Sequence, residues 1–162
     1  MLRNAIPVLL SVLALAGSEM APMAEAAGAE GTFVVETAYA AVSAGDVETA
    51  ITYLTDDAMF SVVPKSSRMS APALVGKSEI GGWWTGTYKD NGRVEFANLV
   101  EDGDRATFTC LYYGDKLEKL GVSPAEFDGV AILRDGKIRV LVWSYTAAYE
   151  PKLKAALAKL AQ

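Results

Sequence analysis

FDGVAILRDGKIRVLVWSYT, residues 127–146, gives the strongest structural signal in the sequence. Its Asp135-Gly136 dipeptide accepts the positive φ angles of a tight hairpin turn, and the residues on either side are rich in β-branched and aromatic side chains. We therefore expect a long β-hairpin. Its second strand would carry large apolar residues on both faces, with Ile138, Val140 and Val142 on one and Leu141, Trp143 and Tyr145 on the other. Other parts of the chain must cover both faces.

Helical and strand patterns surround this hairpin in a definite order. The sequence predicts a helix that Thr32 caps and Gly45 ends, and a second helix capped by Asp46. The later elements are a strand over 58–63, a helix over 77–88, a hairpin over 93–113, a helical insertion over 115–126, and a final helix that starts at Pro151. Helices grouped with hairpins in this way indicate an α+β domain.

The first residues of the chain have the pattern of a signal peptide. Arg3 precedes an apolar run over 5–16, and Ala24-Glu25-Ala26 offers small residues at the two positions that a signal peptidase reads. We expect cleavage after Ala26, a linker over 27–31, one domain over 32–149 and a C-terminal amphipathic helix over 150–162. The mature protein would be periplasmic or secreted. It would keep no stable membrane anchor, because the apolar run is shorter than the roughly 20 residues that a membrane-spanning helix needs.

The composition excludes several kinds of chemistry. The chain has no histidine, which rules out Ser-His-Asp and Cys-His nucleophiles and histidine-based zinc sites. The single cysteine, Cys110, lies in a strand pattern, where a small buried apolar role is expected. The formal net charge of −5 and the lack of a basic run argue against nucleic acid as a partner. We expect neither a cofactor nor a metal site.

The order of these motifs resembles the nuclear transport factor 2-like superfamily over residues 31–149. The resemblance rests on Gly45-Asp46 between two helices, Asp56-Asp57-Ala58 before a strand, 75–80 opening a helix, and two hairpins with Asp-Gly turns. That superfamily includes ketosteroid isomerases, SnoaL-like cyclases, epoxide hydrolases and non-catalytic binding domains. The resemblance implies a curved antiparallel sheet wrapped around N-terminal helices to form a cone with an internal apolar pocket. It also implies a homodimer through the outer face of the sheet.

The resemblance singles out two candidate catalytic residues. Asp128 falls where ketosteroid isomerases carry a protonated aspartic acid, and a carboxyl in an apolar pocket can have its pKa raised by roughly 3 to 5 units. Tyr39 lies within one residue of the position of the oxyanion-hole tyrosine in that family. The base of the isomerases would fall at Val62, which cannot take a proton. The arginine and aspartate of the epoxide hydrolases would fall at Cys110 and Tyr112.

No complete catalytic set is therefore visible, and the leading hypothesis is an exported domain that binds a small apolar molecule. The residues expected to line its pocket are Tyr53, Trp83, Trp84, Tyr112 and Glu95. Only one of the two adjacent tryptophans can face inward. One alternative is a lyase, isomerase or cyclase that uses Asp128 with a pocket tyrosine, and another is a dimeric interaction module without a ligand. A carboxylate such as Glu95 facing Asp128 would favour the enzyme hypothesis, whereas a solvent-exposed Asp128 would exclude it.

Overall fold

The computed structural model describes residues 33–66 and 68–160. Their elements are α1 (Val34–Ser43), α2 (Val47–Thr52), β1 (Leu54–Val63), β2 (Leu74–Val75), α3 (Gly76–Lys89), β3 (Arg93–Asp102), β4 (Arg105–Tyr113), α4 (Asp115–Lys119), β5 (Ala125–Arg134), β6 (Lys137–Tyr145) and α5 (Glu150–Leu160). The expected signal peptide, linker and Thr32 cap lie outside the described residues. Among those described, no helix combines the length and hydrophobicity needed to cross a bilayer.

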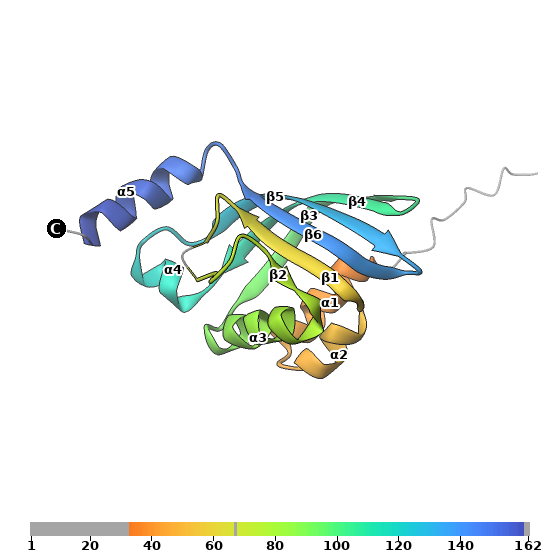
Figure 1. Cartoon of the computed structure of the whole chain (residues 1–162). Helices are drawn as coiled ribbons and strands as arrows, with labels where there is room; N and C mark the ends of the chain where they lie inside the picture. Colours follow the sequence, from red (N-terminus) through yellow and green to blue (C-terminus); the bar gives the residue numbers. More distant parts are fainter. Residues whose placement is uncertain (1–32, 67, 161–162) are drawn as a thin grey trace, which may run out of the picture. The chain divides into compact units, whose positions relative to one another are not determined.

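The strands form one six-stranded curved sheet in the order β2-β1-β6-β5-β4-β3. Neighbouring strands run antiparallel except β1 and β6, which are parallel. Helices α1, α2 and α3 lie together on one side of this sheet (Figure 1). The expected α+β fold, a curved sheet that wraps around the N-terminal helices, is confirmed.

Local sequence signals explain how the N-terminal helices end and begin. Gly45, at φ +82°, takes up a left-handed conformation after α1, and its N–H donates to the carbonyl of Val42. Asp46 caps α2, since its Oδ1 accepts a hydrogen bond from the N–H of Thr49 at 3.0 Å. The strand expected over 58–63 is longer than predicted, because β1 begins at Leu54.

The central hairpin forms as predicted, with one change in the direction of its side chains. Asp135 and Gly136 have φ angles of +54° and +69°, as a tight hairpin turn requires. Between β5 and β6 the register shifts, and Arg139 is the extra residue on β6. Ile138 is therefore buried with Leu141 and Trp143, and the expectation that it shares a face with Val140 and Val142 is wrong.

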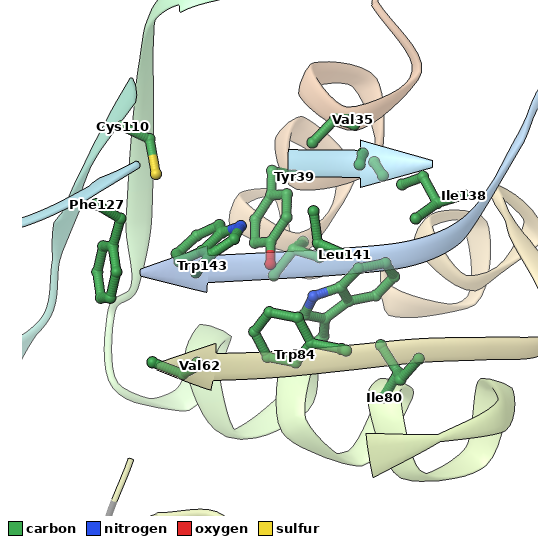
Figure 2. Packing of buried hydrophobic residues seen from close by; sticks show 14 of the residues in the cluster. Val35, Tyr39, Val62, Ile80, Trp84, Cys110, Phe127, Ile138, Leu141 and Trp143 are labelled. Atoms are coloured by element: carbon green, nitrogen blue, oxygen red, sulfur yellow. The ribbon is translucent and has the colours of Figure 1, made fainter. Parts of the chain in front are cut away.

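The core lies between the helices and the concave side of the sheet. Figure 2 shows Tyr39 of α1 between Trp143 of β6 and Trp84 of α3. The ring of Tyr39 stacks on Trp143 at 5.0 Å and meets Trp84 edge-on at 5.5 Å. Gly129 leaves room for the ring of Phe108, since a Cβ at this glycine would lie only 2.0 Å from it. Inward side chains on β4 and β5 are thus packed closely.

Candidate functional site

A pocket of about 80 Å³ opens at the end of the sheet where β1, β5 and β6 approach α3 and α4. Its apolar walls are aromatic side chains and a few aliphatic ones: Phe60, Val62, Trp83, Leu117, Ala125, Phe127, Trp143 and Tyr145. These aromatic rings contact one another, with centroids 5.7 Å apart for Phe60 and Trp83 and 4.5 Å apart for Phe127 and Tyr145. The walls therefore favour a flat apolar group.

One side of this pocket is polar. Asp90, the residue that ends α3, is only 7% exposed, and its Oδ2 accepts a hydrogen bond from the hydroxyl of Tyr112 at 3.5 Å. Gly114 makes room for both groups, because a Cβ at its position would lie 2.8 Å from Asp90 Oδ2 and 2.9 Å from Tyr112 Oη. The N–H of Asp115 donates to the carbonyl of Asp90 at 2.9 Å and holds this segment in place. A buried carboxylate and a phenol thus face the pocket together.

Two cations complete the lining. The guanidinium of Arg68 lies 4.4 Å from the centre of the Trp83 ring, in cation–π geometry, and Lys116 of α4 lines the same pocket. Burial raises the pKa of Tyr112, the charge of Arg68 opposes this increase, and Asp90 adds to it. The hydroxyl of Tyr112 is therefore protonated at neutral pH and can donate a hydrogen bond.

Of the residues predicted to line a pocket, Trp83 and Tyr112 lie on the wall of this one. Trp84 is fully buried in the core, so the two adjacent tryptophans do face different ways. Tyr53 does not line this pocket. It is half-buried at the end of α2, where its carbonyl accepts a hydrogen bond from the N–H of Ile138. For Trp84 and Tyr53, the expectation of a pocket role is wrong.

Tyr39 also lies outside the pocket lining. Its side chain is 3% exposed, and burial raises the pKa of its hydroxyl. That hydroxyl and the indole nitrogens of Trp84 and Trp143 are buried without a hydrogen-bond partner in the described part of the chain. Tyr39 is thus a core residue, and no group among the described residues accepts a hydrogen bond from its hydroxyl.

The alternation of side chains along β5 and β3 shows that Asp128 and Glu95 do not face the pocket. On β5, Phe127 and Gly129 face the core, so Asp128 between them is exposed on the outer face, opposite Thr109 of β4. Glu95 is also exposed on the outer face, where it pairs with Arg93 and accepts a hydrogen bond from Tyr113. Neither carboxylate reaches the pocket, so the catalytic arrangement built on Asp128 is lost.

Sequence reasoning missed Asp90 and did not assign Arg68 to the site. Asp90 lies in Lys89-Asp90-Asn91-Gly92, whose composition is typical of a turn that ends a helix. Arg68 lies in a segment without periodicity, so its sequence does not indicate which way it points. The one usable signal was that Asp90 directly follows a helix whose Trp83 was already a pocket candidate.

The fold first defines a class of protein, the nuclear transport factor 2-like cone. Within that class, the chain belongs to the SnoaL-like domain family, which matches residues 35–141. A search of curated protein sequences finds no match.

Three solved structures illustrate the likeness. A nuclear transport factor 2-like protein from Cytophaga hutchinsonii superimposes with a TM-score of 0.55 and 12% identity, over 71% of this chain and 88% of that chain. An LEH-like epoxide hydrolase from M. tuberculosis superimposes with a TM-score of 0.55 and 18% identity, over 79% of this chain and 92% of that chain. A computationally designed 17-OHP binder superimposes with a TM-score of 0.59 and 17% identity, over 72% of this chain and 90% of that chain. At such identities, the likeness concerns the fold.

Proposed function

We propose that this domain binds a small, largely apolar molecule in the pocket between α3 and the sheet. The observation that carries the proposal is an aromatic pocket with one buried polar side, formed by Asp90 and Tyr112. Such a site suits a molecule with an apolar ring and one hydrogen-bonding group. The designed 17-OHP binder, which has the same fold, supports the view that this architecture can hold a ligand.

The present size of the pocket limits what it admits without rearrangement. An apolar cavity of roughly 150 Å³ holds benzene, whereas this pocket measures about 80 Å³. Arg68 is exposed and lies over the half-buried ring of Trp83. A ligand with one aromatic ring would therefore enter by displacing the Arg68 side chain, which costs little because that side chain is solvated.

Mass spectrometry of the molecules extracted from the purified protein tests the proposal. We expect a small organic molecule to accompany the wild-type protein in a fixed ratio. Ala125→Leu should lose it, because Ala125 is 1% exposed on the pocket wall and the larger side chain fills the space. The matched control is Ala97→Leu, an exposed site on β3. Equal recovery from both variants would contradict binding in this pocket.

The alternative activity, a lyase, isomerase or cyclase, now depends on Asp90 and Tyr112. The observation that favours it is a buried carboxylate in contact with a protonated phenol inside a pocket, which can act as a base and an acid in one step. If the protein converts its ligand, Asp90→Asn should still bind the ligand and should accumulate it unchanged. If Asp90→Asn both binds the ligand and converts it, Asp90 is not the base.

We also propose a homodimer through the outer face of the sheet. Helices α1, α2 and α3 leave this face open, and it carries Met59 and Val63, which are 44% and 49% exposed, beside half-buried Val130 and Val142. Val130 and Val142 are directly paired across β5 and β6. Val130→Lys with Val142→Lys should halve the mass measured by light scattering. A monomeric wild type would contradict the proposal.

Export remains part of the proposal because residues 1–26 carry the signal-peptide pattern. Expression of the full chain in a bacterial host with Sec export should give a mature protein in the periplasm whose N-terminus is Ala27. A cytoplasmic protein that keeps Met1 would contradict this.

A further inference from the structure

A second hollow lies between α5 and the segment that joins α4 to β5. It has a volume of about 620 Å³ and shares no lining residue with the pocket described above. Its apolar surface comes from residues such as Val122 and Pro124 on one wall and Ala156 on α5. The hollow is therefore a separate groove whose walls are partly apolar and partly polar.

The charge around this groove differs from that of the chain as a whole. Among the described residues that line it, Lys119, Lys152 and Lys159 are basic and Glu126 alone is acidic, so the formal charge of this lining is 3 − 1 = +2. The whole chain has a formal net charge of −5. None of these three lysines has an ion-pair partner within residues 33–66 and 68–160, whereas the neighbouring Lys154 pairs with Glu150. A positive site on an acidic protein favours an anionic ligand.

Two residues that line this groove carry buried hydroxyl groups. The side-chain oxygens of Tyr149 and Ser123 are buried and have no hydrogen-bond partner in the described part of the chain, and both residues line the groove. Tyr149 is 1% exposed, and its ring stacks on Tyr145 at 5.6 Å, which fixes its position. Unpaired buried hydroxyls cost stability, and an acceptor atom supplied by a ligand would satisfy them.

We propose that this groove binds a single anionic amphiphile, a molecule with a carboxylate or similar anionic head on an apolar body. The lysines would attract the head group and the apolar parts of the walls would hold the body. The hydroxyls of Tyr149 and Ser123, which are covered in this structure, would donate to the head-group oxygens after a rearrangement of the side chains around them. A single molecule fits better than a bilayer surface, because the groove is a recess of about 620 Å³ between two segments of the chain, which a flat bilayer does not enter.

Dodecanoate below its micelle-forming concentration is the probe, followed by ¹H–¹⁵N NMR of the full-length mature protein. We expect the amides of residues 119–126 and 149–159 to shift. The indole signals of Trp83, Trp84 and Trp143 should stay in place, because none of these three tryptophans lines the groove. Shifts confined to the indoles would overturn the proposal, as would equal shifts with dodecanol, which carries no charge.

Charge variants with a matched control test the lysines. Lys119→Gln with Lys152→Gln and Lys159→Gln should weaken dodecanoate binding about tenfold. Lys89→Gln with Lys137→Gln and Lys154→Gln removes the same number of charges and should leave it within about twofold, because none of these residues lines the groove. Equal weakening in both sets would mean that net charge alone attracts the probe, which overturns the site.

The hydroxyl and the groove itself are tested separately. Tyr149→Phe keeps the ring stack and should weaken binding about fivefold, since it removes one donor. Ala156→Trp should block the groove without a change of charge. Binding to phosphatidylglycerol vesicles that survives Ala156→Trp, with no response to dodecanoate, would overturn the proposal in favour of a membrane surface.

Discussion

Truncation of Trp143 should destabilise the domain through the loss of its aromatic contacts. The side chain is 4% exposed, with ring centroids 5.0 Å from Tyr39, 5.0 Å from Phe127 and 6.0 Å from Phe60. Replacing a buried tryptophan by alanine costs about 3 to 5 kcal/mol. The buried indole N–H has no hydrogen-bond partner among the described residues. Its removal should therefore offset about 1 kcal/mol of the loss in the free energy of unfolding. We therefore expect Trp143→Ala to lower the free energy of unfolding by about 3 kcal/mol.

Trp143→Phe is the matched control for this prediction. It keeps an aromatic ring in the cluster and removes the unpaired N–H, so we expect a cost of about 1 kcal/mol or less. Urea unfolding followed by far-ultraviolet circular dichroism measures both variants without depending on tryptophan fluorescence. A Trp143→Ala midpoint close to that of the wild type would refute the packing described for the core. A Trp143→Phe cost equal to that of alanine would show that the aromatic ring at this position adds no stability, which would also refute the packing.

Other predictions follow from single positions. Gly82→Ala should stabilise the domain by about 1 kcal/mol, because the site is helical and a Cβ meets nothing within 4 Å. Gly129→Ala should instead destabilise it by about 1 to 3 kcal/mol, since the Cβ would collide with the ring of Phe108; thermal unfolding of both variants checks the opposite signs. Burial raises the pKa of Cys110 to about 12, so Ellman's reagent at pH 8 should modify this thiol only after urea unfolding, and rapid labelling of the folded protein would contradict its burial. Hydrogen bonds from Thr49 lower the pKa of Asp46, so its contribution is present at neutral pH and is lost as the pH falls through the lowered pKa. Asp46→Asn keeps a capping side chain and should therefore reduce the loss of stability on acidification, as measured by urea midpoints between pH 6 and pH 2; an unchanged pH profile would contradict that linkage.

The fold was predictable because its signals are local and repeated. Asp135-Gly136, Gly45-Asp46 and the alternation along β4 each follow from a short-range rule that operates within a few residues. The bulge at Arg139 was not predictable, because an extra residue on one strand is defined only by its partner strand. It changed the face on which Ile138 lies and left the hairpin itself intact.

The site was less predictable than the fold for a different reason. Asp128 was placed in the pocket by a resemblance, whereas the period of the strand alone would have put it outside, between inward-facing Phe127 and Gly129. Asp90 and Arg68 reach the pocket from the end of a helix and from an irregular segment, where no periodicity indicates direction. Trp83 and Tyr112 belong to regular elements, and for these two residues the sequence indicated a pocket role that the structure also gives them.

The central claim is that the pocket between α3 and the sheet accepts a small apolar molecule with one polar group. Phenol is a suitable probe, because its ring matches the aromatic walls and its hydroxyl can donate to Asp90. In ¹H–¹⁵N spectra recorded during a phenol titration, we expect the indole signals of Trp83 and Trp143, which line the pocket, to shift together and to saturate. The same titration of Ala125→Leu should leave them unmoved, and saturable shifts that persist in this variant, or no shifts in the wild type, would contradict the claim.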